Sequence, residues 1–109
     1  MATAYKSPKQ SSPNANTLTD LYTVPAATQA VASSISVCNR DSNPGKFRIA
    51  VSVGGGAIAD KDYLHYDTQI AGNDNYTATI GPTLTATDIV RVYSSNGLIS
   101  FNMFYLEIT

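Results

Sequence analysis

The chain has 109 residues, a formal net charge of −1 and only 14% charged residues. This size predicts one domain, and the balanced charge argues against a dedicated nucleic-acid-binding protein, which usually carries a basic patch. The single cysteine, Cys38, excludes an internal disulfide and a multi-cysteine metal site. No apolar run approaches the ~18 residues of a membrane span, and the N-terminus lacks the apolar segment of a signal peptide, so we expect neither a membrane nor a nucleic-acid partner.

Residues 1–17 differ in composition from the rest of the chain. Ser, Pro, Asn, Thr and Lys dominate there, and such a segment buries too little apolar surface to fold by itself. It contains Lys6 and Lys9 but no acidic residue. We therefore predict an extended N-terminal arm over residues 1–17, which runs over a neighbouring subunit and contacts it through Tyr5, Lys6 and Lys9. The remaining residues, 18–109, form the folded domain.

From Leu18 onwards the sequence has the pattern of short β-strands separated by turns. Alternation of apolar and polar residues is clearest over residues 46–53, and strands are also predicted over 18–24, 28–40, 62–70, 76–81, 87–95 and 98–108. The Asn96-Gly97 pair between the last two strands predicts a β-hairpin. This spacing of strands and turns predicts an all-β fold, an antiparallel β-sandwich of about seven to eight strands with jelly-roll or immunoglobulin-like wiring.

The alternation also predicts which side chains form the core. These are the apolar residues on one face of each central strand: Phe47, Ile49, Val51, Leu64, Tyr66, Val90, Val92, Ile99 and Phe101. A register error of one residue in any strand would exchange its inside and outside faces.

Three consecutive glycines, Gly54 to Gly56, follow a predicted strand, as in a phosphate-binding loop. Such a loop requires a helix N-terminus directly after it, because aligned N–H groups bind the anion. Here another strand follows and no Gly-Lys-Ser/Thr sequence is present. We interpret the glycines as a flexible connection between antiparallel strands, and expect no nucleotide cofactor.

Two further sets of residues contain side chains that could bind a metal or act in catalysis, but they lack the spacing or the partners that such a site needs. Asp60, Asp62, Asp67 and Asp74 lack the regular spacing of a calcium loop, so we interpret them as solvated loop carboxylates. His65 is the only histidine and shares a predicted outward strand face with Asp67, which is typical of polar surface. We therefore predict no catalytic residue, no metal and no enzymatic activity.

Two surface features are less ordinary. Small residues form one face of the strand over 28–40, which suits close approach by another surface or by the second sheet of the fold: Ala30, Ala32, Ser34, Ser36 and Cys38. The C-terminal strand is apolar on both faces, and therefore needs cover on both. Either another subunit or the N-terminal arm would supply that cover, over Phe104, Tyr105, Leu106 and Ile108.

The sequence resembles the small virion structural proteins of tailed bacteriophages, in particular phages of cyanobacteria and other aquatic bacteria. The most specific pieces of the resemblance are Leu-Tyr-Thr-Val-Pro-Ala-Ala at 21–27 and Cys-Asn-Arg at 38–40, and it covers nearly the whole chain beyond the arm. The resemblance implies a component of the virion that is assembled in the host cytoplasm, and it supplies no catalytic residues.

On this basis we expect a structural accessory protein that decorates or cements the capsid. Its expected partners are the major capsid protein or tail and neck proteins, and further copies of the chain as a homo-oligomer. The alternative is a tail, neck or fibre-associated domain that contacts the host surface. A sugar site in such a domain would need exposed aromatic side chains, which Tyr63, Tyr93 and Tyr105 would supply.

Overall fold

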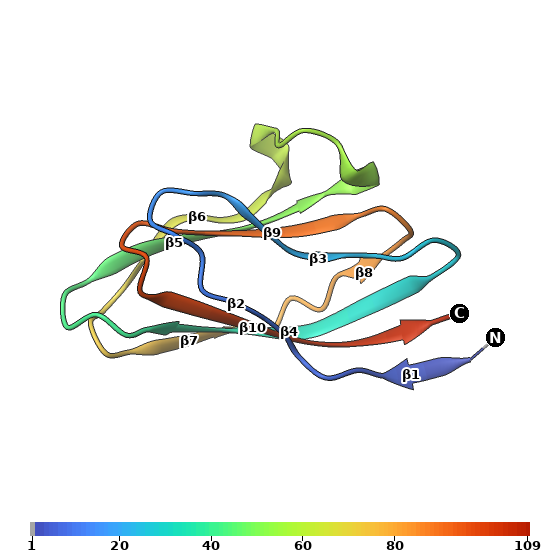
Figure 1. Ribbon diagram of the computed structural model, residues 1–109, viewed down its shortest axis with the longest axis horizontal. Helices are drawn as coiled ribbons and strands as arrows, with labels where there is room; N and C mark the ends of the chain where they lie inside the picture. The colour runs from blue at the N-terminus through green and yellow to red at the C-terminus, as the bar shows by residue number, and fades with distance from the viewer. Residues whose placement is uncertain (1) are drawn as a thin grey trace.

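The computed structural model describes residues 2–109 and shows two antiparallel β-sheets packed face to face (Figure 1). Sheet A contains β1 (Thr3–Tyr5), β2 (Lys9–Ser11), β4 (Gln29–Asn39), β7 (Asn75–Ala78), β8 (Thr83–Leu84) and β10 (Ile99–Ile108). Sheet B contains β3 (Thr19–Thr23), β5 (Gly45–Ser52), β6 (Tyr63–Ile70) and β9 (Ile89–Ser94). Two 3-10 turns, Val53–Gly55 and Asp60–Asp62, lie in the β5–β6 connection. The predicted all-β sandwich is confirmed.

The order of the strands decides between the two predicted wirings. In sheet A the order is β1 and β2 at one edge, then β10 and β4, with β7 and β8 at the other edge. In sheet B the order is β3-β9-β5-β6. When each pair of short edge strands is counted as one, this is the eight-strand arrangement of a jelly roll, in which two Greek keys supply strands to both sheets.

The N-terminal segment is the first strand position of this jelly roll. Tyr5 pairs with Leu106, and Lys9 pairs with Met103, so both β1 and β2 add to the free edge of β10. The prediction that the arm lies over a neighbouring subunit is therefore wrong for residues 3–5 and 9–11. The polar composition of residues 1–17 predicted a separate arm because these strands bury few side chains. Backbone hydrogen bonds to β10 hold them in place instead.

The Asn96-Gly97 turn does not close a hairpin. The strands on either side of it, β9 and β10, belong to different sheets, so the turn carries the chain from one layer to the other. Gly97 has a φ of +72°, but Asn96 is not among the residues with positive φ. The Asn96 side chain instead accepts a hydrogen bond from the N–H of Leu98 (2.8 Å) and thereby shapes the turn.

The core lies between the sheets and contains the predicted set Phe47, Ile49, Val90, Val92, Ile99 and Phe101, all of them buried. Val51 is partly buried and packs against this cluster. The rings of Phe47 and Phe101, from opposite sheets, meet edge to face with centroids 6.3 Å apart. Burial of large apolar side chains from both layers is the main favourable contribution to folding.

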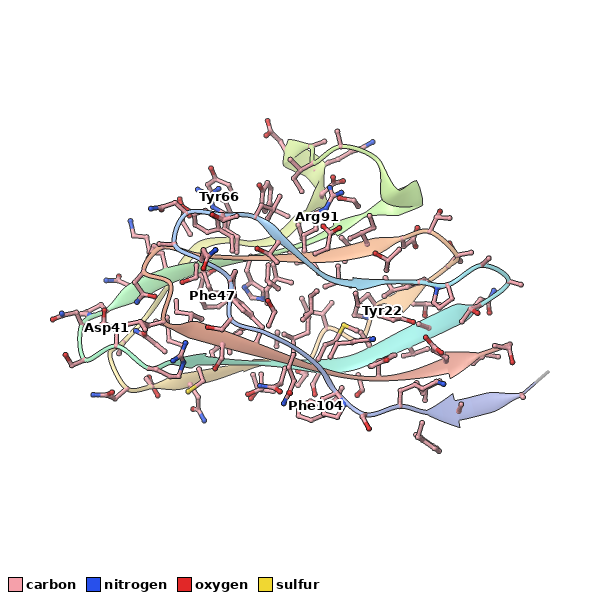
Figure 2. All side chains as sticks on the ribbon, in the orientation of Figure 1. Tyr22, Asp41, Phe47, Tyr66, Arg91 and Phe104 are labelled. Atoms are coloured by element: carbon pink, nitrogen blue, oxygen red, sulfur yellow. The ribbon has the colours of Figure 1, made fainter. Side chains whose placement is uncertain are left out.

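The core prediction fails in β6, where Leu64 and Tyr66 are 41% and 58% exposed. The register of β5 and β6 shifts at Leu64, which is an extra residue opposite the Ile49–Ala50 step. Opposite Arg48, β6 again contains one residue more than β5, and Asp67 at this point has a φ of +49°. A bulge of this kind reverses which side chains point inward. Hence Tyr66 points to solvent from the outer face of sheet B (Figure 2).

The same bulge turns His65 inward. Its ring packs against Phe47 and Tyr76, with centroids 5.6 and 5.4 Å away, and burial lowers the pKa of His65. The prediction that His65 is outward polar surface is wrong. Within residues 2–109 its buried Nε2 atom has no hydrogen-bond partner, which fits a neutral ring in apolar surroundings.

A second bulge changes the expected face of small residues on β4. Ser33 is an extra residue opposite the Phe104–Tyr105 step of β10. As a result Ala30 and Ala32 face the core and are buried, whereas Ser34, Ser36 and Cys38 lie half-buried on the outer face. The predicted continuous face is split between the core and the surface.

Asn39, at the end of β4, is fully buried and joins the loops at one end of the sandwich. Its amide nitrogen donates to the backbone carbonyls of Asn43 (3.0 Å), Ile70 (3.4 Å) and Ala71 (3.2 Å). Its side-chain oxygen accepts from the backbone N–H of Asp41 (3.1 Å) and the amide of Asn96 (3.3 Å). The Cys-Asn-Arg piece of the resemblance therefore has a structural role at its asparagine.

Candidate functional site

The outer face of sheet A carries an apolar patch, hereafter the sheet A patch, formed by Tyr5, Val31, Phe104, Leu106 and Ile108. Leu106 pairs with Tyr5 on one side and with Val31 on the other, and paired residues share a face of the sheet. Tyr5 is 87% and Phe104 is 42% exposed, and Phe104 points away from sheet B (Figure 2). Three adjacent strands thus place large apolar side chains side by side in solvent.

The rest of this outer face is flat. Its side chains are small and half-buried: Ser34, Ser36, Cys38, Ser100 and Asn102. A level surface of this kind next to an apolar patch allows another protein surface to approach closely, and contiguous exposed apolar side chains mark interaction surfaces.

The structure separates the seven predicted interface residues into two groups. Tyr5, Phe104, Leu106 and Ile108 meet in the sheet A patch. Tyr105 instead points inward, where its ring lies 4.7 Å from that of Tyr22. Lys6 forms an ion pair with Glu107 (3.7 Å), and Lys9 lies 5.9 Å from the centre of the Tyr22 ring. The three inward-directed residues close the edge of the sandwich rather than its outer face.

The buried end of that edge contains a hydrogen bond from the Tyr22 hydroxyl to the Glu107 carboxylate (2.5 Å). Burial, together with this hydrogen bond, raises the pKa of Tyr22 well above its usual range. Tyr22 therefore stays protonated and serves as a donor that ties β3 to β10.

The outer face of sheet B carries a cluster of aromatic rings around one cation. The guanidinium of Arg48 lies between the rings of Tyr66 and Tyr93, 4.2 Å from each centroid, and 5.9 Å from that of Tyr63. It also donates two hydrogen bonds to Asp67, at 2.7 and 3.3 Å. The bidentate pair and the two stacking contacts fix Arg48 rigidly.

The positive charge of Arg48 in this cluster is neutralised by the carboxylate of Asp67. The hydrogen bonds and charge of Arg48 lower the pKa of Asp67, and the same contacts raise that of Arg48. Arg91, further along the same face, is held by Asp20 (3.0 Å), by the Ser52 hydroxyl (2.9 Å) and by the Gly56 carbonyl (3.0 Å). Both arginines therefore have protein partners. The interpretation of Asp67 as a solvated loop carboxylate is wrong. It is also wrong for Asp62, which is buried and accepts hydrogen bonds from the Ala59 N–H (2.9 Å) and the Ser52 hydroxyl (3.4 Å).

Beside the cluster, Asp60, Tyr63 and Tyr66 line a shallow depression of about 470 Å³. The rings of Tyr63 and Tyr66 meet at 83°, with centroids 4.8 Å apart, so they form a right-angled corner. The alternative interpretation of the sequence named Tyr63, Tyr93 and Tyr105. The cluster contains the first two, but Tyr105 is buried against Tyr22, and Tyr66 and Arg48 were missed. The outward position of Arg48 in the alternating strand over 46–53 was the available signal.

The three glycines connect β5 to β6, two antiparallel strands, as predicted. Gly54 and Gly55 have φ values of +74° and +71°, which other residues rarely adopt. The N–H of Gly54 donates to the buried carboxylate of Asp88 (2.8 Å), which also accepts from the N–H and hydroxyl of Thr85. Burial raises the pKa of Asp88, but these hydrogen bonds outweigh it and the pKa lies below its usual range.

Within residues 2–109, no three His, Cys, Asp or Glu side chains lie close enough together to hold a metal ion. In the same residues no helix has the length and apolar character needed to cross a membrane.

Comparisons with protein-family models, with curated protein sequences and with solved structures found no match to this chain.

Proposed function

We propose that this chain is a structural accessory protein of a tailed-bacteriophage particle, in which it decorates or cements the capsid. The observation that carries the proposal is the sheet A patch, which offers apolar side chains from β1, β4 and β10 to another protein surface. The resemblance at residues 21–27 and 38–40 supplies the phage particle as the setting. The role is non-catalytic, and the proposed location is the virion.

The proposed partners are the major capsid protein, or tail and neck proteins, together with further copies of the chain. Leu106 stands at the centre of the patch, with Tyr5 of β1 paired on one side and Val31 of β4 on the other, and Phe104 lies next to it on the same outer face of β10. Removing such central apolar side chains from an interface lowers affinity more than changes at its rim.

The test is incorporation of variant chains into phage particles. The double variant Phe104→Thr and Leu106→Thr keeps strand-favouring residues while removing two of the five apolar side chains of the patch. We expect its incorporation, measured by mass spectrometry of purified particles, to fall by about tenfold or more, since each 1.4 kcal/mol is a factor of about ten. Val53→Thr is the matched control, because Val53 is 78% exposed but lies in the β5–β6 connection.

Normal incorporation of a correctly folded double variant would exclude the sheet A patch as the docking surface. Absence of the wild-type chain from purified particles would overturn the particle role itself. The number of copies of the chain per particle distinguishes capsid decoration from a place on the tail or neck. A number that matches the capsid subunits supports decoration, and a number that matches the tail or neck supports the alternative.

A further inference from the structure

The corner formed by Tyr63 and Tyr66 remains open to solvent on one side, although Tyr66 also stacks on Arg48. Tyr66 is 58% exposed and lies on the face opposite the sheet A patch. Among residues 2–109, the hydroxyls of Tyr22 and Tyr93 donate to protein oxygens, at 2.5 and 2.7 Å. Those of Tyr63 and Tyr66 have no such protein acceptor and remain available to a ligand.

The corner is also preorganised. The Arg48 guanidinium covers one face of Tyr66 at 4.2 Å, and Asp67 fixes that guanidinium through two hydrogen bonds. A rigid aromatic surface loses little conformational freedom when a ligand binds to it. The planes of the two rings meet at 83°, so a ligand can contact both rings at once.

The groups around the corner define the chemistry of the ligand. Two aromatic rings favour an apolar face on the ligand, and two phenolic hydroxyls with the Asp60 carboxylate supply hydrogen-bond acceptors for ligand hydroxyls. The charge of Arg48 is already paired with Asp67, while Asp60 adds a negative charge that repels anions. A ligand with an apolar face, several hydroxyls and no negative charge meets all of these conditions.

We propose that the corner of Tyr63, Tyr66 and Asp60 is a binding site for a neutral hexose saccharide. The C–H face of a pyranose ring lies on one tyrosine ring, its edge contacts the other, and its hydroxyls donate to Asp60. This site goes beyond the particle role and uses the opposite face of the molecule, so docking and saccharide binding are separable.

The test uses the isolated full chain and four soluble probes: maltotetraose, mannotetraose, a galactose tetrasaccharide and, as the acidic comparison, tetragalacturonate. Saturation-transfer NMR detects binding, and titration of a ¹⁵N-labelled chain gives the affinity and the amides that shift. We expect at least one neutral probe to bind in the millimolar range, where ~1 mM corresponds to about −4 kcal/mol. The shifted amides should lie in residues 60–67.

Tyr66→Ala should weaken that binding by about tenfold, because the loss of one stacked ring is worth about 1.4 kcal/mol. Asp60→Ala is a second variant that leaves both rings in place, and it should also weaken binding. Tyr5→Ala is the matched control, since it removes an exposed tyrosine from the other sheet and should leave the affinity within about twofold.

Three results would overturn the proposal. These are no saturable binding of any neutral probe up to about 10 mM, equal or tighter binding of tetragalacturonate, and equal losses of affinity in Tyr66→Ala and Tyr5→Ala. Loss of incorporation into particles in Phe104→Thr and Leu106→Thr would bear on the docking surface alone.

Discussion

The large side chains on the two outer faces of this sandwich have different surroundings. On sheet B, Arg48 and Arg91 bind carboxylates of the same chain, and tyrosine rings pack on Arg48. On sheet A, the large side chains Phe104 and Tyr5 are exposed to solvent. The first face is held together by contacts within the chain, whereas the second gains most when another surface covers it.

The fold alone therefore does not determine the function of either face. Jelly rolls occur in viral capsids and in lectins, so the architecture is compatible with docking to a particle and with saccharide binding. The surfaces carry the distinction, since apolar residues on a flat sheet suit a protein partner and a rigid ring corner suits a small polar ligand. Substitutions that separate the two faces are therefore the informative ones.

The largest effect is expected between the inner and outer sides of one strand. Phe101 and Phe104 both lie on β10, but Phe101 is fully buried and Phe104 is 42% exposed. Phe101→Ala should destabilise the chain by roughly 3–5 kcal/mol, because a buried aromatic leaves a cavity. Phe104→Ala, the control, should cost less than about 1 kcal/mol. Urea denaturation measures both, and equal losses would contradict the assignment of the outer face.

The next effect concerns the buried link between the sheets. Asn39→Ala removes the donor for three carbonyls and the acceptor for two N–H groups. Buried groups left without partners predict a loss of about 3 kcal/mol in the free energy of unfolding. Asn102→Ala is the matched control on the outer face of sheet A, and it should change stability by less than about 0.5 kcal/mol. If the two variants melt alike, Asn39 does not join the loops.

Acid should weaken the sheet B side through its carboxylates. The pKa of Asp88 and that of Asp67 lie below the ordinary value of 3.8, so their ionised forms stabilise the folded chain. This stability is fully present above about pH 4 and is lost as the pH falls through the folded pKa values. Most of this loss should come from Asp88, which is the more buried of the two carboxylates. Asp88→Asn should flatten the acid dependence of the urea midpoint, and an unchanged slope would refute this origin.

The smallest effect tests the cation between the rings. Arg48→Met keeps an unbranched apolar stem but removes the ion pair and the stacking charge, with an expected cost of about 1 kcal/mol. Arg40→Met is the control, because Arg40 is exposed and its side chain, within residues 2–109, donates only to the Ser12 hydroxyl (2.7 Å). Thermal melting of both variants measures the difference. If Arg48→Met melts no lower than Arg40→Met, the charge of Arg48 adds nothing to the stability of sheet B.

Sequence patterns predicted the fold class and the central strands because alternation is strong there. Phe47 and Ile49 in β5, and Phe101 in β10, face the core where period-two alternation placed them. Prediction failed where one extra residue reverses that alternation, at Asp67 in β6 and at Ser33 in β4. A bulge has no reliable sequence signal, since its energy is set by pairing with a neighbouring strand.

The candidate sites were predictable to different degrees for the same reason. Phe104, Leu106 and Ile108 of the sheet A patch were recognised because the C-terminal strand is apolar on both faces, which requires no knowledge of pairing. Tyr5 was predicted only as a contact of the arm, and Val31 was missed because its outward position depends on the bulge at Ser33. The ring corner on sheet B was only partly recognised, because Tyr66 reaches the outer face through the bulge and Arg48 meets it across two strands. The hydrogen bonds of β1 and β2 with β10 likewise lie between segments far apart in the chain.

The pairing of β1 with β10 has a practical consequence for how the chain can be rewired. Ala2 and Thr109 exchange two backbone hydrogen bonds, of 2.7 and 2.8 Å, so a linker of a few residues is sufficient to join them. New ends can be opened in the β5–β6 connection at residues 57–59, which are exposed and lie between the two 3-10 turns. Such a circular permutant keeps every strand of the jelly roll. It also moves any fused cargo to the sheet B side, above the layers in Figure 1, and leaves the sheet A patch unobstructed.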